Sequence, residues 1–259
     1  MKITQWKFAG ASVIGTSHES KGKECEDSWG GVISKTGEIL CLCVADGAGT
    51  AIHARIGATK TTKWLPKRLT NDFDVIFASN DESLRTLICT ELQNHLRRVA
   101  KRRGHDLCDY ACTVVAVVLH CDGRWLAFHI GDGGIVGLFE DGLHIISAPK
   151  KGEYANETFF ITNHLPEQYM SIIRSDSFRD NVRLKGVALF SDGVEGSLID
   201  RRENTVAKAV EKMIGWLKDN KRKKSERALK KSLEETFRKK SSDDCTVAIC
   251  LCPPPPDDD

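Results

Sequence analysis

Short apolar runs alternate with polar turns along most of the chain. The runs at 40–45, 125–130 and 187–190 are apolar at consecutive positions, which is typical of strands covered on both faces. The remaining runs are shorter or alternate with polar residues, as half-buried strands do. They predict further strands at 3–16, 28–33, 111–120, 134–139, 143–147 and 245–252.

Helical periodicity predicts helices in three regions. The first covers 52–69 and is expected to end at or just before Pro66, because proline lacks the amide N–H that a helix needs. The second runs from the acids at Asp81 and Glu82 to Gly104, and the third is the charged segment 205–240 with two apolar stripes.

Between the strands at 143–147 and 187–190 the periodicity weakens. Pro149, Gly152, Asn156, Asn163 and Pro166 interrupt the segment 148–180. We expect an irregular insertion there that lies beside the functional site as a flap, with one short strand at 159–161.

The order of elements favours a fold in which helices pack on antiparallel sheets. Through 111–147 strand follows strand across tight turns, which predicts an antiparallel meander and argues against a doubly wound nucleotide-binding fold. No linker rich in proline, glycine or serine divides the interior, so we expect one domain. The closing PPPPDDD at 253–259 is expected to be a disordered tail.

Three of the apolar runs end in an aspartate beside a glycine: Asp46, Asp132 and Asp192. A single Asp-Gly pair is most often an ordinary turn. Repeated at the ends of covered strands, the same arrangement gathers carboxylates that repel one another unless a cation lies among them. Hard divalent ions such as Mg²⁺ and Mn²⁺ prefer such oxygen ligands, so the pattern predicts a metal site.

Composition bears on the partners, the cellular location and the state of the cysteines. The net charge of +2 over 259 residues gives no argument for a nucleic acid or a membrane as partner. No stretch is long and apolar enough for a membrane span, and the first residues lack the apolar core of a secretory signal, so we expect a cytoplasmic location. The ten cysteines form no CxxC pair, which favours reduced thiols over zinc or disulfides.

Six motifs in order resemble those of the metal-dependent PP2C-type serine/threonine protein phosphatases, in a divergent, bacterial-like branch. They are ECEDSWGGV, VADGAGT, YACTVVAVVL, LAFHIGDGGIV, ALFSDGV and DDCTVAICL, spread over about residues 10 to 252. The resemblance implies one domain over 1–252 with an α+β fold, a four-layer α-β-β-α sandwich of two antiparallel sheets flanked by helices. It also implies a centre of two Mn²⁺ or Mg²⁺ ions.

The resemblance assigns roles to particular residues. Asp46 is expected to bridge the two metals beside the carbonyl of Gly47, and Asp46, Asp192 and Asp243 form the catalytic set. The full expected metal set is Glu26, which holds waters of one ion, Asp46, Gly47, Asp192, Asp243 and, for a third and weaker site, Asp132.

This chain departs from the family pattern where substrate phosphate is bound. Gly22 stands where relatives commonly carry an arginine, and His18, Lys21 or Lys23 are the expected replacements. A lysine is a point charge without the planar fork of arginine, so weaker phosphate binding is expected. Elsewhere Asp244 replaces the usual asparagine, and Glu195 lies one position before the familiar aspartate.

The sequence therefore predicts a phosphatase that hydrolyses phosphoserine and phosphothreonine in proteins with a metal-activated water. We expect it to oppose a serine/threonine kinase and to be a monomer. The alternative is a catalytically weak or inactive PP2C-like module that binds a phosphorylated partner, motivated by Gly22. A third reading is a regulator that acts on one dedicated switch protein.

Overall fold

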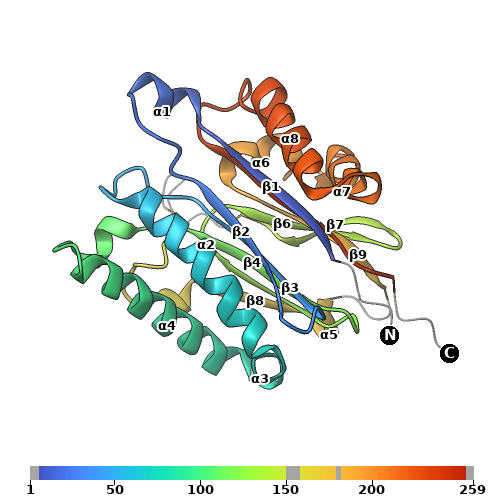
Figure 1. Cartoon of the computed structure of the whole chain (residues 1–259), viewed down its shortest axis with the longest axis horizontal. Coiled ribbons are helices and arrows are strands. Elements are labelled where there is room, and N and C mark those ends of the chain that lie inside the picture. Colours follow the sequence, from blue (N-terminus) through green and yellow to red (C-terminus); the bar gives the residue numbers. More distant parts are fainter. Residues whose placement is uncertain (1–5, 150–157, 179–181, 255–259) are drawn as a thin grey trace.

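The computed structural model describes residues 6–149, 158–178 and 182–254, and in it two five-stranded antiparallel sheets face each other (Figure 1). The predicted four-layer sandwich is confirmed. The first sheet contains, in spatial order, β1 (Lys7–Val13), β12 (Cys245–Leu251), β9 (Leu184–Phe190), β6 (Gly134–Phe139) and β7 (Gly142–Ser147). The second contains β2 (Ser28–Ile33), β3 (Ile39–Ala45), β4 (Val114–His120), β5 (Trp125–Ile130) and β8 (Ser171–Arg174).

Helices cover the outer face of each sheet (Figure 1). The second sheet packs against α2 (Ala54–Asn71), α3 (Phe73–Ala78) and α4 (Asp81–Lys101). The first sheet packs against α6 (Asp192–Leu198), α7 (Ala209–Asp219), α8 (Arg222–Ser232) and the π-helical turn Leu233–Phe237. The smaller elements are α1 (Thr16–Ser20), α5 (Ser175–Phe178), the 3₁₀ turns Leu107–Tyr110 and Pro166–Gln168, and a hairpin of β10 (Ile199–Asp200) and β11 (Thr205–Val206).

The position of strand β3 between two hydrophobic cores explains why its sequence is apolar at every position. Leu40, Leu42 and Val44 face the core between the two sheets, whereas Cys41 and Cys43 face the core under α2 and α4. All five side chains are fully buried. Since neighbouring residues of a strand point to opposite faces, a strand between two cores needs apolar residues on both.

The predicted end of the first helix at Pro66 is wrong, because α2 continues to Asn71. Pro66 has no N–H for the carbonyl of Thr62, one turn earlier. That carbonyl lies instead against Gly30 of β2, where a Cβ atom would come within 2.2 Å of it. The helix tolerates the proline because the carbonyl that loses its donor packs on a strand position without a side chain.

The predicted meander through 111–147 is only partly right. Strands β4 and β5 pair in the second sheet, but β6 and β7 pair in the first, so the chain crosses between the sheets after Ile130. Gly131 makes this crossing with φ of +108°, a conformation that disfavours other residues, and it packs against Thr113. Asp132 thereby lies at the junction of the two sheets.

The segment 148–180 is less irregular than predicted. Ser171–Arg174 form strand β8, which pairs with β5 at the edge of the second sheet. Residues 159–161 are not a strand, although Ile161 is fully buried in the core under α4. The centre of the predicted flap, 150–157, lies outside the described residues, as does most of the predicted tail.

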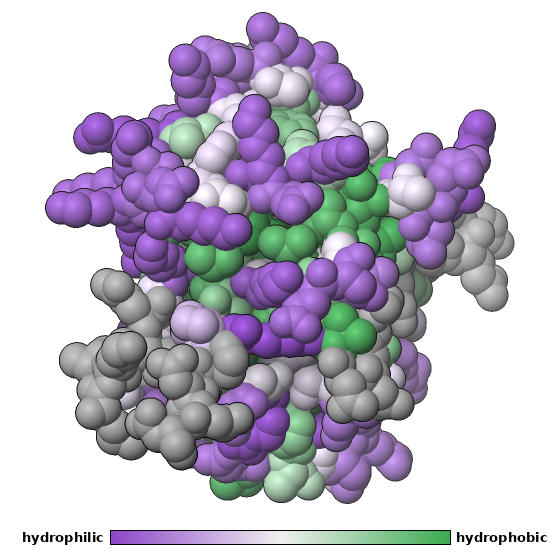
Figure 2. All heavy atoms as spheres, turned by 90° about the vertical axis from the view of Figure 1, so that its right-hand side faces the viewer, coloured by the Kyte–Doolittle hydropathy of each residue, from purple (hydrophilic) through white to green (hydrophobic). Residues whose placement is uncertain are grey.

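The end of the sandwich where β1 begins and β12 ends faces the viewer in Figure 2, which shows apolar side chains exposed between polar ones. The turn between β4 and β5 lies at this end and lines a pocket of about 580 Å³ with Trp6, Trp125 and Cys252. All ten cysteines lie in the described ranges as free thiols, and six of them are buried. None of the helices in the described ranges has the length and apolar character needed to cross a membrane.

One pH effect on stability follows from the packing of α4 on α2. The ring of His95 stacks on Trp64 at 5.3 Å, and burial, aided by the charges of Arg98, Lys60 and Arg102, lowers the pKa of His95 below 6.5. The unfolded chain therefore binds more protons than the folded one as pH falls below 6.5, so this contribution to stability is full above 6.5 and declines below it. Between pH 7.5 and pH 5.5 the melting temperature of the wild type should fall further than that of His95→Phe.

Candidate metal centre

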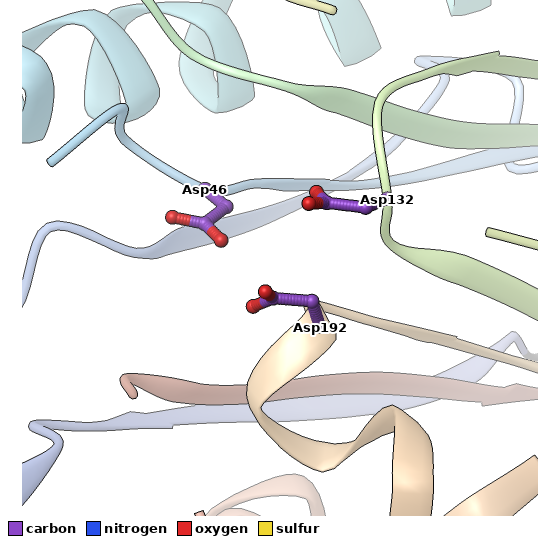
Figure 3. Close-up of side chains that lie close together, drawn as sticks. All are labelled: Asp46, Asp132 and Asp192. Atoms are coloured by element: carbon purple, nitrogen blue, oxygen red, sulfur yellow. The ribbon is translucent and has the colours of Figure 1, made fainter. Parts of the chain in front are cut away.

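Three aspartates converge where the two sheets meet (Figure 3). Each of Asp46, Asp132 and Asp192 offers a carboxylate oxygen, and these oxygens all lie within 4.8 Å of one another. Asp46 follows β3 of the second sheet, Asp132 lies on the crossing from β5 to β6, and Asp192 begins α6 after β9 of the first sheet. The juxtaposition expected from the repeated Asp-Gly strand ends is therefore present.

The backbone of Asp46 is held on both sides by one residue of the neighbouring strand. Its N–H donates to the hydroxyl of Thr113 at 3.0 Å, and its carbonyl accepts the Thr113 N–H at 2.8 Å. Gly47 then faces Cys112 as an isolated antiparallel bridge. In the described part of the chain, no hydrogen-bond donor contacts the Gly47 carbonyl oxygen. No described hydrogen bond would have to break for this oxygen to bind a metal, and its role as a ligand stays a prediction.

Asp27 also belongs to the site, although the sequence analysis gave this acid no role. Its carboxylate accepts the Ser191 hydroxyl at 2.6 Å, and burial raises its pKa to about 7. The signal was available in the strand register: Ser28 of β2 pairs with Ala45 of β3, so the preceding residue, Asp27, falls opposite Asp46. Ser191, one residue before Asp192, thus ties this acid to the first sheet.

The electrostatics of the cluster fit a cation. Burial raises the pKa of Asp46 well above its usual value, and the negative charges of Asp27, Asp192 and Asp243 raise it further. Carboxylates that ionise at neutral pH in this arrangement repel one another, and a divalent ion among them removes that cost. The all-oxygen donor set suits Mg²⁺ or Mn²⁺.

A second group of residues flanks the cluster rather than joining it. Asp243 is exposed, two residues before β12, and acts on Asp46 through its charge. Asp244 is buried and accepts the N–H groups of Gly15 at 2.7 Å and Glu26 at 2.6 Å, and it contacts His18 Nδ1 at 3.0 Å. An asparagine would offer only one acceptor oxygen here, whereas the carboxylate of Asp244 uses both of its oxygens in these contacts.

The expected phosphate-binding residues lie around Glu26. The other ring nitrogen of His18 is 3.6 Å from Glu26, so binding phosphate would require His18 to leave a carboxylate. Lys23 Nζ lies 3.2 Å from Glu26 and 3.3 Å from the Gly49 carbonyl, whereas Lys21 is exposed. The phosphate contacts of these three residues stay predictions, as do the metal roles of Glu26 and Asp243.

Metal binding should stabilise the fold measurably. A ligand at one hundred times its dissociation constant adds about 2.7 kcal/mol, which raises the melting temperature of a domain of this size by roughly 5–10 °C. We expect this rise on adding Mn²⁺ to EDTA-treated protein in a thermal unfolding assay, and a clearly smaller rise for Asp192→Asn. Equal melting temperatures with Mn²⁺ and with EDTA would contradict a metal site here.

Comparison with known proteins places these features in a family. Residues 14–238 match the family model described as protein phosphatase 2C. A curated relative, serine/threonine-protein phosphatase 3 of Escherichia coli (strain K12), is 29% identical over 203 residues, which are 77% of this chain and 78% of that protein.

Solved structures agree on the fold. Serine/threonine phosphatase Stp1 from Staphylococcus aureus superposes with a TM-score of 0.61 at 14% identity, covering 96% of this chain and 95% of that one. PppA, a regulatory component of the T6SS in Pseudomonas aeruginosa, gives a TM-score of 0.58 at 17% identity, with 96% and 98% covered. At these identities the likeness supports the architecture, not particular roles.

Proposed function

Because the chain belongs to the protein phosphatase 2C family, we propose that it removes phosphate from phosphoserine and phosphothreonine at a centre of two Mg²⁺ or Mn²⁺ ions. The observation that carries the proposal is the convergence of Asp46, Asp132 and Asp192 within 4.8 Å at the junction of the sheets. Bound divalent ions lower the pKa of coordinated water and offset the negative charge of a phosphoryl group under attack.

The residues of the chain would hold and orient these ions. Asp46 is proposed to bridge them, which agrees with its position between acids from both sheets and with the free carbonyl of Gly47 beside it. The remaining proposed ligands are Asp192 and Asp243 for one ion, Glu26 through water for the other, and Asp132 for a third, weaker site.

Attack by water rather than by a cysteine agrees with the state of the thiols. Cys245 is the residue directly after the acids Asp243 and Asp244, and burial, together with the charges of nearby aspartates, raises its pKa to about 12. A thiol that stays protonated at neutral pH is a poor nucleophile. The proposed mechanism therefore needs no covalent intermediate.

The alternative, a module that binds a phosphorylated partner without turnover, rests on Gly22. This glycine has φ of +66° and open space around it, so no side chain reaches phosphate from that position. The retained set of aspartates favours catalysis. An opposing serine/threonine kinase, a monomeric state and a cytoplasmic location belong to the same proposal and rest on the sequence alone.

The test is phosphate release from a phosphothreonine peptide and from p-nitrophenyl phosphate with Mn²⁺, Mg²⁺ or EDTA. We expect turnover with at least one ion and none with EDTA. Folded protein that binds Mn²⁺ but releases no phosphate from either substrate would reject the enzyme in favour of the binding module.

A further inference from the structure

Arg201 lies in the turn of the β10–β11 hairpin, directly after the helix that Asp192 begins. Its guanidinium forms a two-point contact with Glu195, in which Nε contacts Oε1 and Nη2 donates to Oε2 at 2.8 Å. Glu195 is buried and lies three residues after Asp192, so the two project from neighbouring positions of α6. The ion pair therefore connects the hairpin to the helix that carries a metal-site acid.

The geometry of the pair leaves half of the guanidinium available. Arginine can make a two-point contact along either of two edges, and Glu195 occupies the edge formed by Nε and Nη2. Nη1 has no partner among the described residues, and the Arg201 side chain is 44% exposed. The second edge, formed by Nη1 and Nη2, is thus held in a fixed orientation with solvent access.

The turn that carries Arg201 is itself well ordered by hydrogen bonds. The side chain of Asp200 accepts the backbone N–H groups of Arg202 at 2.9 Å and of Glu203 at 3.2 Å. Such a turn limits the positions open to Arg201, so less conformational entropy is lost when its free edge binds a ligand.

The guanidinium is also within electrostatic reach of the aspartate cluster. Its hydrogen bond to Glu195, followed by the negative charges of Glu195 and Asp132, raises the pKa of Arg201. The cations named earlier as replacements already have partners of their own: His18 and Lys23 contact Glu26, and Lys21 contacts Ser17.

We propose that the free edge of Arg201 binds the phosphate group of the substrate at the rim of the metal centre, with Glu195 as the residue that positions it. This inference rests on the proposed function and supplies the guanidinium that is missing at Gly22. A planar fork matches two phosphate oxygens, which a lysine cannot do.

Inorganic phosphate is the probe, because it is the product and can be measured without turnover. Calorimetric binding of phosphate to Mn²⁺-loaded protein should be about tenfold weaker for Arg201→Ala, as expected for the loss of a partly exposed charge-assisted contact. In steady-state assays the same variant should raise KM for the phosphothreonine peptide more than it lowers kcat. Arg202→Ala, which removes an exposed arginine from the same turn, should change phosphate binding by less than about twofold.

Two results would overturn the assignment. One is phosphate binding by Arg201→Ala equal to that of the wild type. The other is a loss of phosphate binding that is matched by an equal loss of Mn²⁺ affinity, which would make Arg201 a structural partner of Glu195 only.

Two further arms keep the test decisive. If Arg201→Ala fails to fold because Glu195 is left unpaired, the double variant Arg201→Met/Glu195→Gln removes both charges together and should still bind phosphate weakly; wild-type affinity in it overturns the proposal. If the wild type shows no turnover with any ion, the proposed function fails, yet the calorimetric comparison of the arginine variants still decides the role of Arg201.

Discussion

Asp46→Asn should abolish metal-dependent turnover while leaving the fold intact. A divalent ion contributes several kcal/mol of transition-state stabilisation, which corresponds to about a thousandfold in kcat, and Asp46 is the acid at the centre of the cluster. The measurement is phosphate release from the phosphothreonine peptide at saturating Mn²⁺.

Although Asp46→Asn should lose turnover, it should not lose stability in the absence of metal. The pKa of Asp46 is raised in the folded state, so the folded protein loses stability as pH rises and this carboxylate ionises. A neutral asparagine avoids that loss. In EDTA at neutral pH, Asp46→Asn should melt at or above the wild-type temperature. Asp219→Asn, an exposed acid at the end of α7, serves as the control and should leave turnover unchanged. Wild-type kcat in Asp46→Asn would refute the proposed centre.

Asp244→Ala should be the most destabilising single change near the site. It leaves the buried N–H group of Gly15 and the partly buried N–H group of Glu26 without their acceptor, and it releases His18. Each buried donor left unsatisfied costs about 1–3 kcal/mol, so a total of roughly 3–5 kcal/mol is expected. Urea unfolding in EDTA, which excludes any contribution from bound metal, measures it.

Asp244→Asn keeps the shape of the side chain and replaces only one of its two acceptor oxygens. The amide keeps one acceptor oxygen but turns an NH₂ group toward one of the two N–H donors, so an intermediate loss of about 1–2 kcal/mol is expected. A loss below about 1 kcal/mol in Asp244→Ala would show that water replaces the carboxylate, and the role assigned to Asp244 would be wrong.

Much of the fold was predictable because its strands carry strong local signals. The apolar runs that became β3 and β9 reflect burial on both faces, and the aspartates at their ends reflect the site. The continuation of α2 beyond Pro66 was not predictable, since it depends on Gly30 of another strand receiving the Thr62 carbonyl. Strand β8 was missed because four residues in an irregular segment carry little periodicity.

In the site, too, residues with a local sequence signal were predictable, and residues placed by contacts between distant segments were not. Asp46, Asp132 and Asp192 were found because each follows the end of its strand within two residues. Asp27 required the register of β2 against β3, and Thr113 required the pairing of Asp46 across to the start of β4. The pairing of Arg201 with Glu195 depends on how a short hairpin folds back on α6, which no local pattern encodes.

The position of β1 has a consequence for how the protein is made. Among the described strands β1 lies at the edge of the first sheet and pairs only with β12, so it must wait for the strand of that sheet that is synthesised last (Figure 1). Until then it exposes an open edge that is prone to wrong pairing. Asp243 and Asp244 lie just before β12, so they take their places beside the metal-site aspartates only when this late pairing forms.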